Sequence, residues 1–406
     1  MRVTILPSLA HGEVPAPPSK SMAHRLLIPA GLADGESVIR GLSMSDDVAA
    51  TIACLRALGA KIRFDGSAAR VHGIPAGSFL SGAVLPCHEC GSTLRFLIPV
   101  ALRSRRKILF TGSEKLLSRP LGVYRDLAAE HGLTFDLSHD GLLVCGPLEG
   151  GTFRFPGNIS SQFVSGLLMA LPSAKEDSRI ELIPPLASRP YIDMTIDALS
   201  RFGIRILREG DYAFRIPGNQ RFTPCEATVE GDHSNAANLA AFGLIGGKVQ
   251  ITGLSPHSLQ GDRVFADSFE KLQNGFAELD LTDCPDLGPI LFAASALCHG
   301  ARFTGTERLR IKESDRVASM AEELEKCGVQ VQIGRDSVVI EKAVPHQPDK
   351  VLSSHNDHRV AMALTLLLSR VGGSLDGAEA VKKSFPDYFE TIKALGIKVQ
   401  NNGMDL

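Results

Sequence analysis

The sequence predicts an α/β (α+β) protein of two similar domains, each made of three repeated βαβαββ-like units whose inner helices run parallel. Two recurring patterns support this prediction. The first is an apolar helical run, a break at Gly or polar residues and a short strand, and its six instances lie near residues 37, 108, 180, 249, 302 and 374. The second is a helix that ends at Gly, which suits the helix C-cap, followed by an alternating strand. It occurs at Gly59, Gly132, Gly203, Gly328 and Gly396, and in a weaker form at Gly275.

The spacing of the copies sets the domain boundaries. Most neighbouring copies lie about 70 residues apart, and the copy that contains Gly275 looks truncated. Ordinary alternation of helices and strands would not keep both patterns in phase. Three units make a domain of normal size. We therefore predict one domain of residues 19–229 and a second of residues 1–18 plus 230–406, with the chain crossing between them at Pro15 to Pro18 and near residues 224–232.

Composition excludes some classes of partner. The 43 Lys and Arg residues against 45 Asp and Glu residues leave a formal charge of -2, which gives no global attraction to nucleic acid or to an acidic membrane. The start lacks a cleavage-like segment, and no apolar run reaches the roughly 18 residues of a membrane-spanning helix. The eight cysteines are too sparse for a disulfide scaffold, and the segment Cys87 to Cys90 lacks a second Cys pair for zinc. We expect a cytoplasmic protein with reduced thiols and no bound metal.

The first apolar helix of each unit begins at a marked sequence, and most of these sequences contain N-cap residues. A symmetric repeat points three such helices the same way in each domain, so their free N–H groups and positive dipole ends converge on one face. That face attracts anions. The six helix starts are Ser19-Lys20-Ser21, Gly91-Ser92-Thr93, Ser160-Ser161-Gln162, Asp232-His233-Ser234, Pro285-Asp286 and Asn356-Asp357-His358.

Four cations lie near these starts, where they oppose the helix dipole: Lys20, Arg25, Arg95 and Arg359. The cost is only about 0.3 to 1 kcal/mol each, so one Arg in isolation is more often a solvated surface cation. Four repeated placements favour an anion site. Arg donates two parallel hydrogen bonds to a carboxylate or phosphate, and Lys acts as a movable point charge. The expected ligand is small and carries several anionic groups.

Two acidic positions have two interpretations each. The segment 312–316 looks helical, and its spacing places Lys312, Glu313 and Arg316 on one side. This pattern is typical of a surface ion-pair ladder, but in a site it would hold a carboxyl group between cations, able to exchange a proton with a substrate. Asp286 follows Pro285 at a helix start and is either an N-terminal cap or a general base.

With these residues assembled, the chain resembles the 5-enolpyruvylshikimate-3-phosphate synthase family from Pro17 to Phe389. Three motifs of that family fall at helix starts identified above, and four more follow in the family's order. The seven motifs are Pro18-Ser19-Lys20-Ser21-Met22-Ala23-His24-Arg25, Gly91-Ser92-Thr93-Leu94-Arg95, Ser160-Ser161-Gln162-Phe163, Ser188-Arg189-Pro190-Tyr191, Lys312-Glu313-Ser314-Asp315-Arg316, Asn356-Asp357-His358-Arg359 and Lys383-Ser384-Phe385-Pro386-Asp387-Tyr388.

The resemblance implies an enzyme of the shikimate pathway, which leads to chorismate and the aromatic amino acids. Its reaction is that of a 3-phosphoshikimate 1-carboxyvinyltransferase: the enolpyruvyl group of phosphoenolpyruvate moves to the 5-hydroxyl of shikimate 3-phosphate, and phosphate is released by addition and then elimination. The resemblance also implies the enolpyruvyl transferase fold, an inverse α/β barrel in each domain, no cofactor, and competition of glyphosate with phosphoenolpyruvate through Arg119, Arg316 and Lys383. We expect a monomer that binds these two small substrates and neither nucleic acid nor membrane.

Site residues follow from the resemblance position by position. It implies that Glu313 protonates the methylene carbon of phosphoenolpyruvate, that Asp286 accepts the hydroxyl proton, and that Lys20 shares in proton transfer. The first domain is then mainly the shikimate 3-phosphate side, and the second carries much of the phosphoenolpyruvate and acid/base side. The residues implied for shikimate 3-phosphate are Lys20, Ser21, Arg25, Ser160, Ser161, Gln162, Ser188, Asp286 and Lys312. The residues implied for phosphoenolpyruvate are Lys20, Gly91, Arg119, Gln162, Arg316, Arg359 and Lys383.

Two departures and two rival functions remain open at this point. Glu89 stands where many members of the family have Asn, and the Asn ahead of the Lys-Glu motif has no counterpart around residues 308–311.

One rival is a UDP-N-acetylglucosamine enolpyruvyl transferase, whose Lys-Asn start is replaced here by Lys20-Ser21. The other is a non-catalytic nucleic-acid-binding repeat protein, which zero Trp, four Tyr and the lack of a basic stripe argue against.

Overall fold

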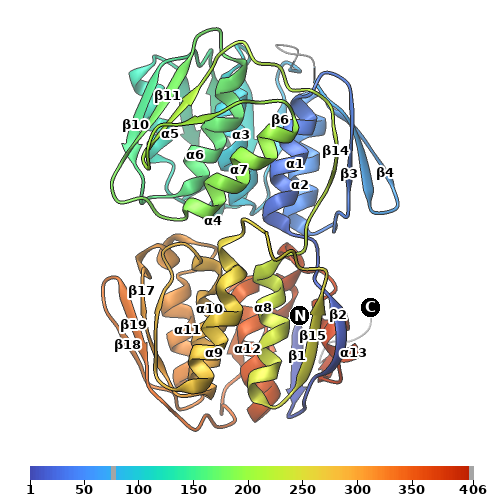
Figure 1. The fold of residues 1–406 in the computed structure, drawn as a ribbon, viewed down its shortest axis with the longest axis vertical. Coiled ribbons are helices and arrows are strands. Elements are labelled where there is room, and N and C mark those ends of the chain that lie inside the picture. The colour runs from blue at the N-terminus through green and yellow to red at the C-terminus, as the bar shows by residue number, and fades with distance from the viewer. Residues whose placement is uncertain (75–78, 402–406) are drawn as a thin grey trace. The chain divides into compact units, whose positions relative to one another are not determined.

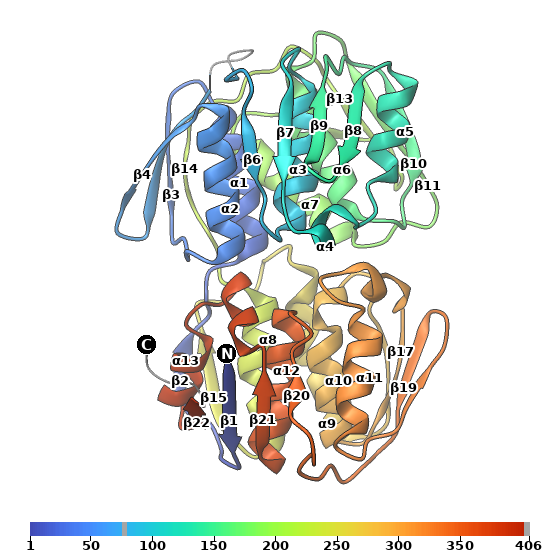
Figure 2. The ribbon, with the colours of Figure 1, turned by 180° about the vertical axis from the view of Figure 1, so that it is seen from behind.

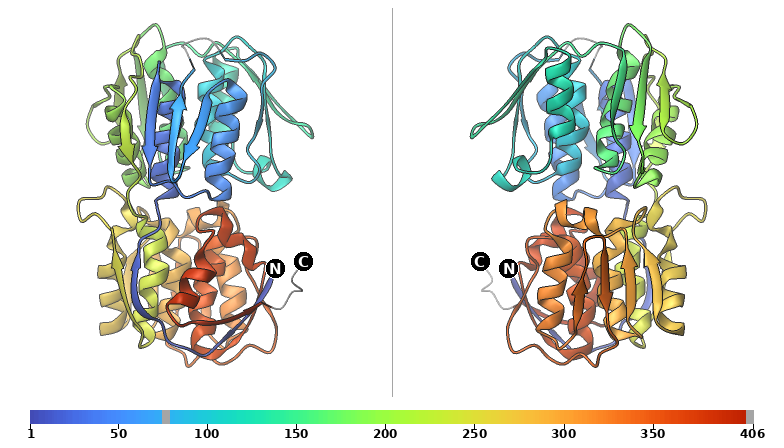
Figure 3. Two further views of the ribbon diagram at one scale, coloured as in Figure 1. Left: turned by 90° about the vertical axis from the view of Figure 1, so that its right-hand side faces the viewer. Right: turned by 90° about the vertical axis from the view of Figure 1, so that its left-hand side faces the viewer.

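The computed structural model describes residues 1–74 and 79–401. The chain divides into two compact units, Pro18–Glu230 and Met1–Pro17 with Gly231–Leu406, here called the N-terminal and C-terminal units. In each unit, taken by itself, sheets surround a set of helices (Figures 1 and 3). Among the described residues, no helix has both the length and the apolar character needed to cross a membrane.

The N-terminal unit contains three copies of a βαβαββ arrangement. The first copy consists of β14 (Glu226–Thr228), α1 (Lys20–Leu32), β3 (Glu36–Arg40), α2 (Asp46–Leu58), β4 (Lys61–Asp65) and β5 (Ala68–His72). The second consists of β6 (Val84–Pro86), α3 (Gly91–Leu102), β7 (Ile108–Thr111), α4 (Glu114–Leu117), α5 (Gly122–Glu130), β8 (Thr134–Ser138) and β9 (Gly141–Cys145). The third consists of β10 (Thr152–Pro156), α6 (Ser161–Ala170), η1 (Leu171–Ser173), β11 (Ser178–Ile183), α7 (Arg189–Arg201), β12 (Leu207–Arg208) and β13 (Ala213–Ile216).

The C-terminal unit repeats the arrangement with one reduced copy. The first copy consists of β2 (His11–Pro15), α8 (His233–Ala240), η2 (Ala241–Ile245), β15 (Lys248–Thr252), η3 (Gly261–Val264) and α9 (Phe265–Asn274). The second consists of β16 (Ala277–Asp280), η4 (Pro285–Leu287), α10 (Gly288–Leu297), β17 (Ala301–Thr304), η5 (Glu307–Ile311), α11 (Arg316–Glu325), β18 (Val331–Ile333) and β19 (Ser337–Ile340). The third consists of β20 (Leu352–Ser353), α12 (His358–Val371), β21 (Gly373–Asp376), η6 (Ala378–Lys383), α13 (Tyr388–Ala394), β22 (Lys398–Asn401) and β1 (Arg2–Leu6).

Five of the six sheets share one strand order, as in β10-β11-β13-β12. The first two strands of this sheet are parallel and joined by a helix, and the last two form an antiparallel hairpin. The sixth sheet pairs only β15 with β2, in the copy whose pattern at Gly275 looked truncated. Strand β1, from the start of the chain, lies between β21 and β22 and completes the last sheet (Figure 2). The predicted sixfold repeat and fold class are therefore confirmed.

The inner helices form the core of each unit. In α3 every residue except Ser92 is buried, because the helix is apolar on all sides and α6 packs directly against it. In the C-terminal unit α10 packs against α12 in the same way. Each unit has its own buried hydrophobic cluster. Because the inner helices are held in place by packing, the residues at their first turns have fixed positions.

Candidate active site

Five of the six predicted helix starts carry side-chain caps in the structure. Ser19 caps α1, Ser160 caps α6, Asp232 caps α8 and Asp357 caps α12, and each accepts a hydrogen bond from a backbone N–H of the first turn. At α3 the cap is the Cys90 sulfur, which accepts from the N–H of Thr93. These caps satisfy part of each helix terminus and leave other N–H groups of the first turn available for a ligand.

In the N-terminal unit, Lys20 lies at the first position of α1 and pairs with an acid that sequence reasoning missed. Its Nζ is 2.8 Å from Asp47 Oδ2, and both side chains are only 11% exposed. Asp47 lies in the first turn of α2, two residues after the N-cap Ser45. An acidic residue in the first turn is the only feature of the local sequence that marks it. The ion pair holds the Lys20 ammonium near the α1 start.

Arg25 is held inside the N-terminal unit. Its guanidinium lies 5.1 Å from the ring centroid of Phe96 and 5.6 Å from that of Tyr191. Nε donates to Thr195 Oγ1 at 2.9 Å, and Nη1 donates to the carbonyl of Ser21 at 2.8 Å. Burial lowers the pKa of Arg25 to about 10, so the side chain stays charged at neutral pH. A buried cation of this kind is already desolvated and can bind an anion strongly.

The start of α6 is joined to that of α3 by Gln162. Its Oε1 accepts from Arg95 Nη1 at 2.7 Å, and its Nε2 donates to Ser92 Oγ at 3.0 Å. Ser161 is buried at the first position of α6, next to the cap Ser160. The structure therefore brings Gln162 to the α3 start.

Gly91, Arg119 and Ser188 are the remaining predicted residues of this unit. A Cβ atom built on Gly91 would lie 2.6 Å from Arg119 Nη1, so the guanidinium rests on the glycine. Ser188 is buried directly before α7 and has a left-handed backbone with φ of 57°. Such a conformation is uncommon outside Gly and is often found at functional sites.

In the C-terminal unit, one buried arginine organises the acid and base predicted from the sequence. Arg316 is 1% exposed and binds three carboxylates. Its Nη1 is 2.8 Å from Asp286 Oδ1, its Nη2 is 2.8 Å from Glu313 Oε2, and its Nε is 2.9 Å from Asp357 Oδ2. Asp286 and Glu313 thus share one guanidinium, which places both carboxyl groups in one cluster.

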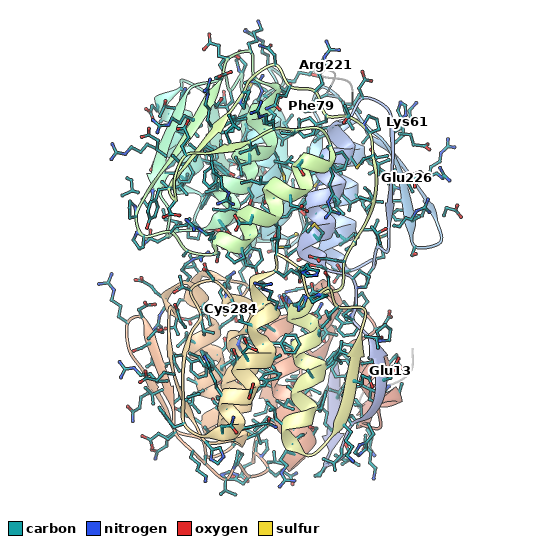
Figure 4. All side chains as sticks on the ribbon, in the orientation of Figure 1. Glu13, Lys61, Phe79, Arg221, Glu226 and Cys284 are labelled. Atoms are coloured by element: carbon teal, nitrogen blue, oxygen red, sulfur yellow. The ribbon has the colours of Figure 1, made fainter. Side chains whose placement is uncertain are left out.

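Asp286 faces cations and does not act as a helix cap. Neither η4 nor α10 has a side-chain cap, and the Asp286 carboxylate also lies 3.4 Å from Lys312 Nζ and 3.7 Å from Arg359 Nη2. It belongs to the segment just after Cys284, which is labelled in Figure 4. Burial alone would raise the pKa of Asp286, but Lys312, Arg316 and Arg359 hold it well below its usual range. The carboxylate is therefore ionised and ready to accept a proton.

The prediction that residues 312–316 form one helix is wrong. The turn η5 ends at Ile311, Lys312 follows it in an extended conformation, and α11 begins only at Arg316. Asp315 caps α11 by accepting from two backbone N–H groups, and a cap residue lies outside the helix. Lys312, Glu313 and Arg316 still lie in one cluster. From the loop, Lys312 contacts Asp286 and Glu313 contacts Arg316.

Asp357 is the acid of this cluster that sequence reasoning did not select. It is fully buried, binds Arg316 through both oxygens, accepts from Ser314 Oγ, and caps α12 through the N–H of Arg359. The only sequence signal is its cap position. Arg359 in turn donates to Asn235 Oδ1 at 3.0 Å, and Lys383 Nζ donates to the carbonyl of Asn356 at 2.6 Å.

The comparison with known proteins gives the family. The family model described as EPSP synthase (3-phosphoshikimate 1-carboxyvinyltransferase) matches residues 7–392. The chain belongs to this family. A 3-phosphoshikimate 1-carboxyvinyltransferase of Clostridium perfringens is 37% identical over 97% of this chain and 98% of its own length. Another of the same name, from Clostridium acetobutylicum, is 38% identical and covers 97% of each chain. The resemblance found in the motifs is thereby confirmed.

Solved structures agree on the fold. An EPSP synthase from Acinetobacter baumannii is 22% identical, covers 98% of this chain and 100% of its own, and has a TM-score of 0.78. A second structure of EPSP synthase from the same organism is 21% identical, with a TM-score of 0.79 over 99% of this chain and 100% of that one. At this level of identity the likeness supports the enolpyruvyl transferase fold, and the residues of the site rest on the geometry described above.

Within residues 1–74 and 79–401, two groups of side chains have donor atoms close enough for a metal ion. His24, Asp47 and Cys90 form one, and Glu322, Glu323 and His355 form the other, with donor atoms within 4.8 Å of one another in each group. In each group, a lysine side chain already binds a carboxylate. Lys20 binds Asp47, as described, and Lys326 Nζ lies 2.9 Å from Glu323 and 3.0 Å from Glu322. The reaction of the family, as the motifs imply it, uses neither group as a metal site.

A cavity of about 360 Å³ lies at the other end of the inner helices of the N-terminal unit. Leu32, Val100 and Met169, from the last turns of α1, α3 and α6, line it together with Phe79 and Arg221, which are labelled in Figure 4. None of the residues that line it belongs to the predicted site. This cavity and the predicted anion-binding face are therefore at opposite ends of the same helices.

Proposed function

We propose that the chain transfers the enolpyruvyl group of phosphoenolpyruvate to the 5-hydroxyl of shikimate 3-phosphate by addition followed by elimination. The observation that carries this proposal is the pairing of Asp286 and Glu313 on one buried guanidinium, that of Arg316. A reaction that adds a proton to carbon and removes one from a hydroxyl needs an acid and a base close together. The cations around them suit a substrate that carries a carboxylate and a phosphate.

In the addition step, Glu313 gives a proton to the methylene carbon of phosphoenolpyruvate, which leaves positive charge at the neighbouring carbon. The 5-oxygen attacks that carbon while Asp286 accepts its proton. In the elimination step, the C–O bond to phosphate breaks, and the new methyl group returns one proton to Glu313, which restores the double bond. The departing phosphate takes up the hydroxyl proton that Asp286 had accepted. Charge on the adduct is stabilised by the cations proposed for this donor: Lys20, Arg119, Arg316, Arg359 and Lys383.

The two units supply different parts of the proposed binding set. The N-terminal unit offers hydroxyl groups and desolvated cations at helix starts, which suit the phosphate of shikimate 3-phosphate: Lys20, Ser21, Arg25, Ser160, Ser161, Gln162 and Ser188. The C-terminal unit adds Lys312 and Asp286 for the same substrate, together with Arg316, Arg359 and Lys383 for the donor.

Phosphate release tests the proposed function. We expect the purified chain to release phosphate from phosphoenolpyruvate with shikimate 3-phosphate as acceptor, and not with UDP-N-acetylglucosamine or with oligonucleotides. Shikimate without its phosphate is the matched control, because it keeps the 5-hydroxyl and lacks the anion. Release with the UDP-sugar alone would assign the chain to the rival transferase, and no release with any acceptor would refute the proposal.

We further propose that the chain acts as a monomer in the cytoplasm and uses neither nucleic acid nor a membrane. Each unit has a complete core of its own, and the formal charge is -2. All eight cysteines are free, as expected in a reducing compartment. Sedimentation across a range of concentrations tests the first point, since a mass above that of one chain would contradict it.

Gly91→Ala is expected to weaken phosphoenolpyruvate and glyphosate together. The new methyl group would lie 2.6 Å from Arg119 Nη1 and force the guanidinium away from its position. Arg119 Nη1 is the far end of a flexible side chain and can move, but its displacement removes a proposed hydrogen bond from this cation to the ligand. That loss costs about 1.5 to 3 kcal/mol, so the KM for phosphoenolpyruvate and the inhibition constant of glyphosate should each rise by at least about 10-fold. Initial rates at varied phosphoenolpyruvate measure both.

The matched control is Gly243→Ala, because a Cβ built there meets nothing within 4 Å. The KM for shikimate 3-phosphate should change little in either variant. If Gly91→Ala leaves both affinities as in the wild type, Gly91 and Arg119 do not border the donor pocket.

A further inference from the structure

Asp262 is a buried acid that the proposed mechanism does not use. It lies in η3 and is 1% exposed. Ser234 Oγ donates a hydrogen bond to its Oδ2. Its other oxygen, Oδ1, is buried and has no hydrogen-bond partner within residues 1–74 and 79–401. A buried carboxylate oxygen without a hydrogen-bond donor lowers the stability of the fold, so its presence requires an explanation.

A complementary donor lies in the same cluster. Arg359 Nε, a group that is always protonated, is also buried without an acceptor in the described part of the chain. The two terminal nitrogens of Arg359 are engaged: Nη1 donates to Asn235 Oδ1 at 3.0 Å, and Nη2 lies 3.7 Å from Asp286 Oδ2. Within the described part of the chain, Asp262 thus has one unmatched acceptor and Arg359 one unmatched donor.

The two groups are near each other in the C-terminal unit. Helix α8, which contains Ser234 and Asn235, packs against both η3 and α12 (Figures 1 and 2). The charged groups around Asp262 shift its pKa. Burial and the carboxylate of Asp286 raise the pKa of Asp262 to about 7, while Ser234 and Arg359 oppose that rise. The Arg359 charge therefore acts directly on the Asp262 carboxyl group.

We propose that Asp262 is a positioning residue for Arg359: when the donor substrate binds, Arg359 Nε donates to Asp262 Oδ1, and the guanidinium turns its terminal nitrogens from Asp286 toward the substrate anion. This inference rests on the proposed role of Arg359 in binding phosphoenolpyruvate. Ser234 keeps the Asp262 carboxyl group in place by holding its other oxygen. Both unmatched groups are satisfied in the substrate complex.

The movement also affects the base. Arg359 is one of three cations that hold the pKa of Asp286 down, after Lys312 and Arg316. When Arg359 turns toward the substrate, Asp286 loses one of them and its affinity for a proton rises. Binding of the donor thus strengthens the base that takes the proton of the acceptor hydroxyl.

The first test compares Asp262→Leu with Asp262→Asn in steady-state kinetics. Leu has a similar size and no acceptor, so we expect the KM for phosphoenolpyruvate to rise about 10- to 150-fold, the usual effect of losing one hydrogen bond to a charged group. The KM for shikimate 3-phosphate should stay within about twofold, which a general structural defect would not produce. Asn keeps an acceptor oxygen and should restore the KM for phosphoenolpyruvate to within about threefold of the wild type.

The matched control is Asp267→Leu, which removes an exposed acid nearby on α9 and should leave both KM values unchanged. The second test is a double-mutant cycle with Arg359→Lys. Lysine has no Nε donor, so Asp262→Leu should add less than twofold to the KM for phosphoenolpyruvate in that background. Should Asp262→Leu not fold, Asp262→Ala takes its place in both tests.

An unchanged KM for phosphoenolpyruvate in a folded Asp262→Leu or Asp262→Ala enzyme overturns the inference, and so do fully additive effects in the cycle. Neither result affects the proposed function, because wild-type phosphate release from phosphoenolpyruvate and shikimate 3-phosphate is measured in the same assay. Absence of that release would refute the proposed function itself.

Discussion

We expect Asp286→Asn to lower kcat by about 100- to 10,000-fold, the range for loss of a positioned general base. The amide has the shape of the carboxylate but cannot accept the hydroxyl proton. In the wild type, Lys312, Arg316 and Arg359 hold the pKa of Asp286 well below its usual range, so Asp286 stays in its base form throughout the neutral and mildly acidic range. Loss of activity between pH 7 and pH 5 should therefore not come from protonation of Asp286 in the free enzyme.

Substrate binding should survive this substitution. Asp286 neutralises part of the charge of Lys312, Arg316 and Arg359 in the empty site, and Asn does not. In the variant, no carboxylate at position 286 competes with the anionic substrate for these cations. Calorimetry with shikimate 3-phosphate should therefore show an unchanged or lower dissociation constant. Asp283→Asn, which removes an exposed acid three residues away, is the control and should keep kcat. Less than about a fivefold fall in kcat for Asp286→Asn would remove it from the role of base.

Much of the fold could be predicted because its signals are local. A Gly at a helix C-cap, such as Gly59, and a cap residue at a helix start, such as Ser19, act within a few residues of the chain. When such signals recur at one spacing, they indicate a repeat without any long-range information. The same reasoning located the reduced copy near Gly275, which has only the strand pair β15 and β2.

The partners within the site could not be predicted in the same way. Asp47 lies 27 residues from Lys20, and Asp357 lies 41 residues from Arg316, and periodicity does not reveal contacts over such separations. The error at residues 312–316 has a physical cause of its own. Charged residues spaced three and four apart occur on helix surfaces, but here Asp315 caps α11, which forces the residues before it into a loop.

Glu313→Gln should have an effect of the same size as Asp286→Asn, about 100- to 10,000-fold on kcat, because Gln has no proton to give to carbon. Glu313 Oε2 lies 2.8 Å from Arg316 Nη2 in the empty site, an arrangement that suits an ionised carboxylate. The proposed donor also binds Arg316. Its anionic groups bind the guanidinium in place of Glu313, and Glu313 takes up a proton from solvent and then acts as an acid.

Isotope incorporation separates the acid from a residue that only binds. In D2O, the wild type should place deuterium in the methylene group of the product, because the addition step adds a solvent-derived proton and the elimination step removes one of three from the methyl group. Glu313→Gln should lose this incorporation along with turnover, while the KM for phosphoenolpyruvate changes by less than about fivefold. Glu307→Gln is the control: its carboxylate is 53% exposed and pairs with Arg335, and surface pairs of this kind contribute little. If Glu313→Gln keeps kcat within about fivefold of the wild type, or if its residual product carries deuterium at the wild-type rate, another group supplies the proton.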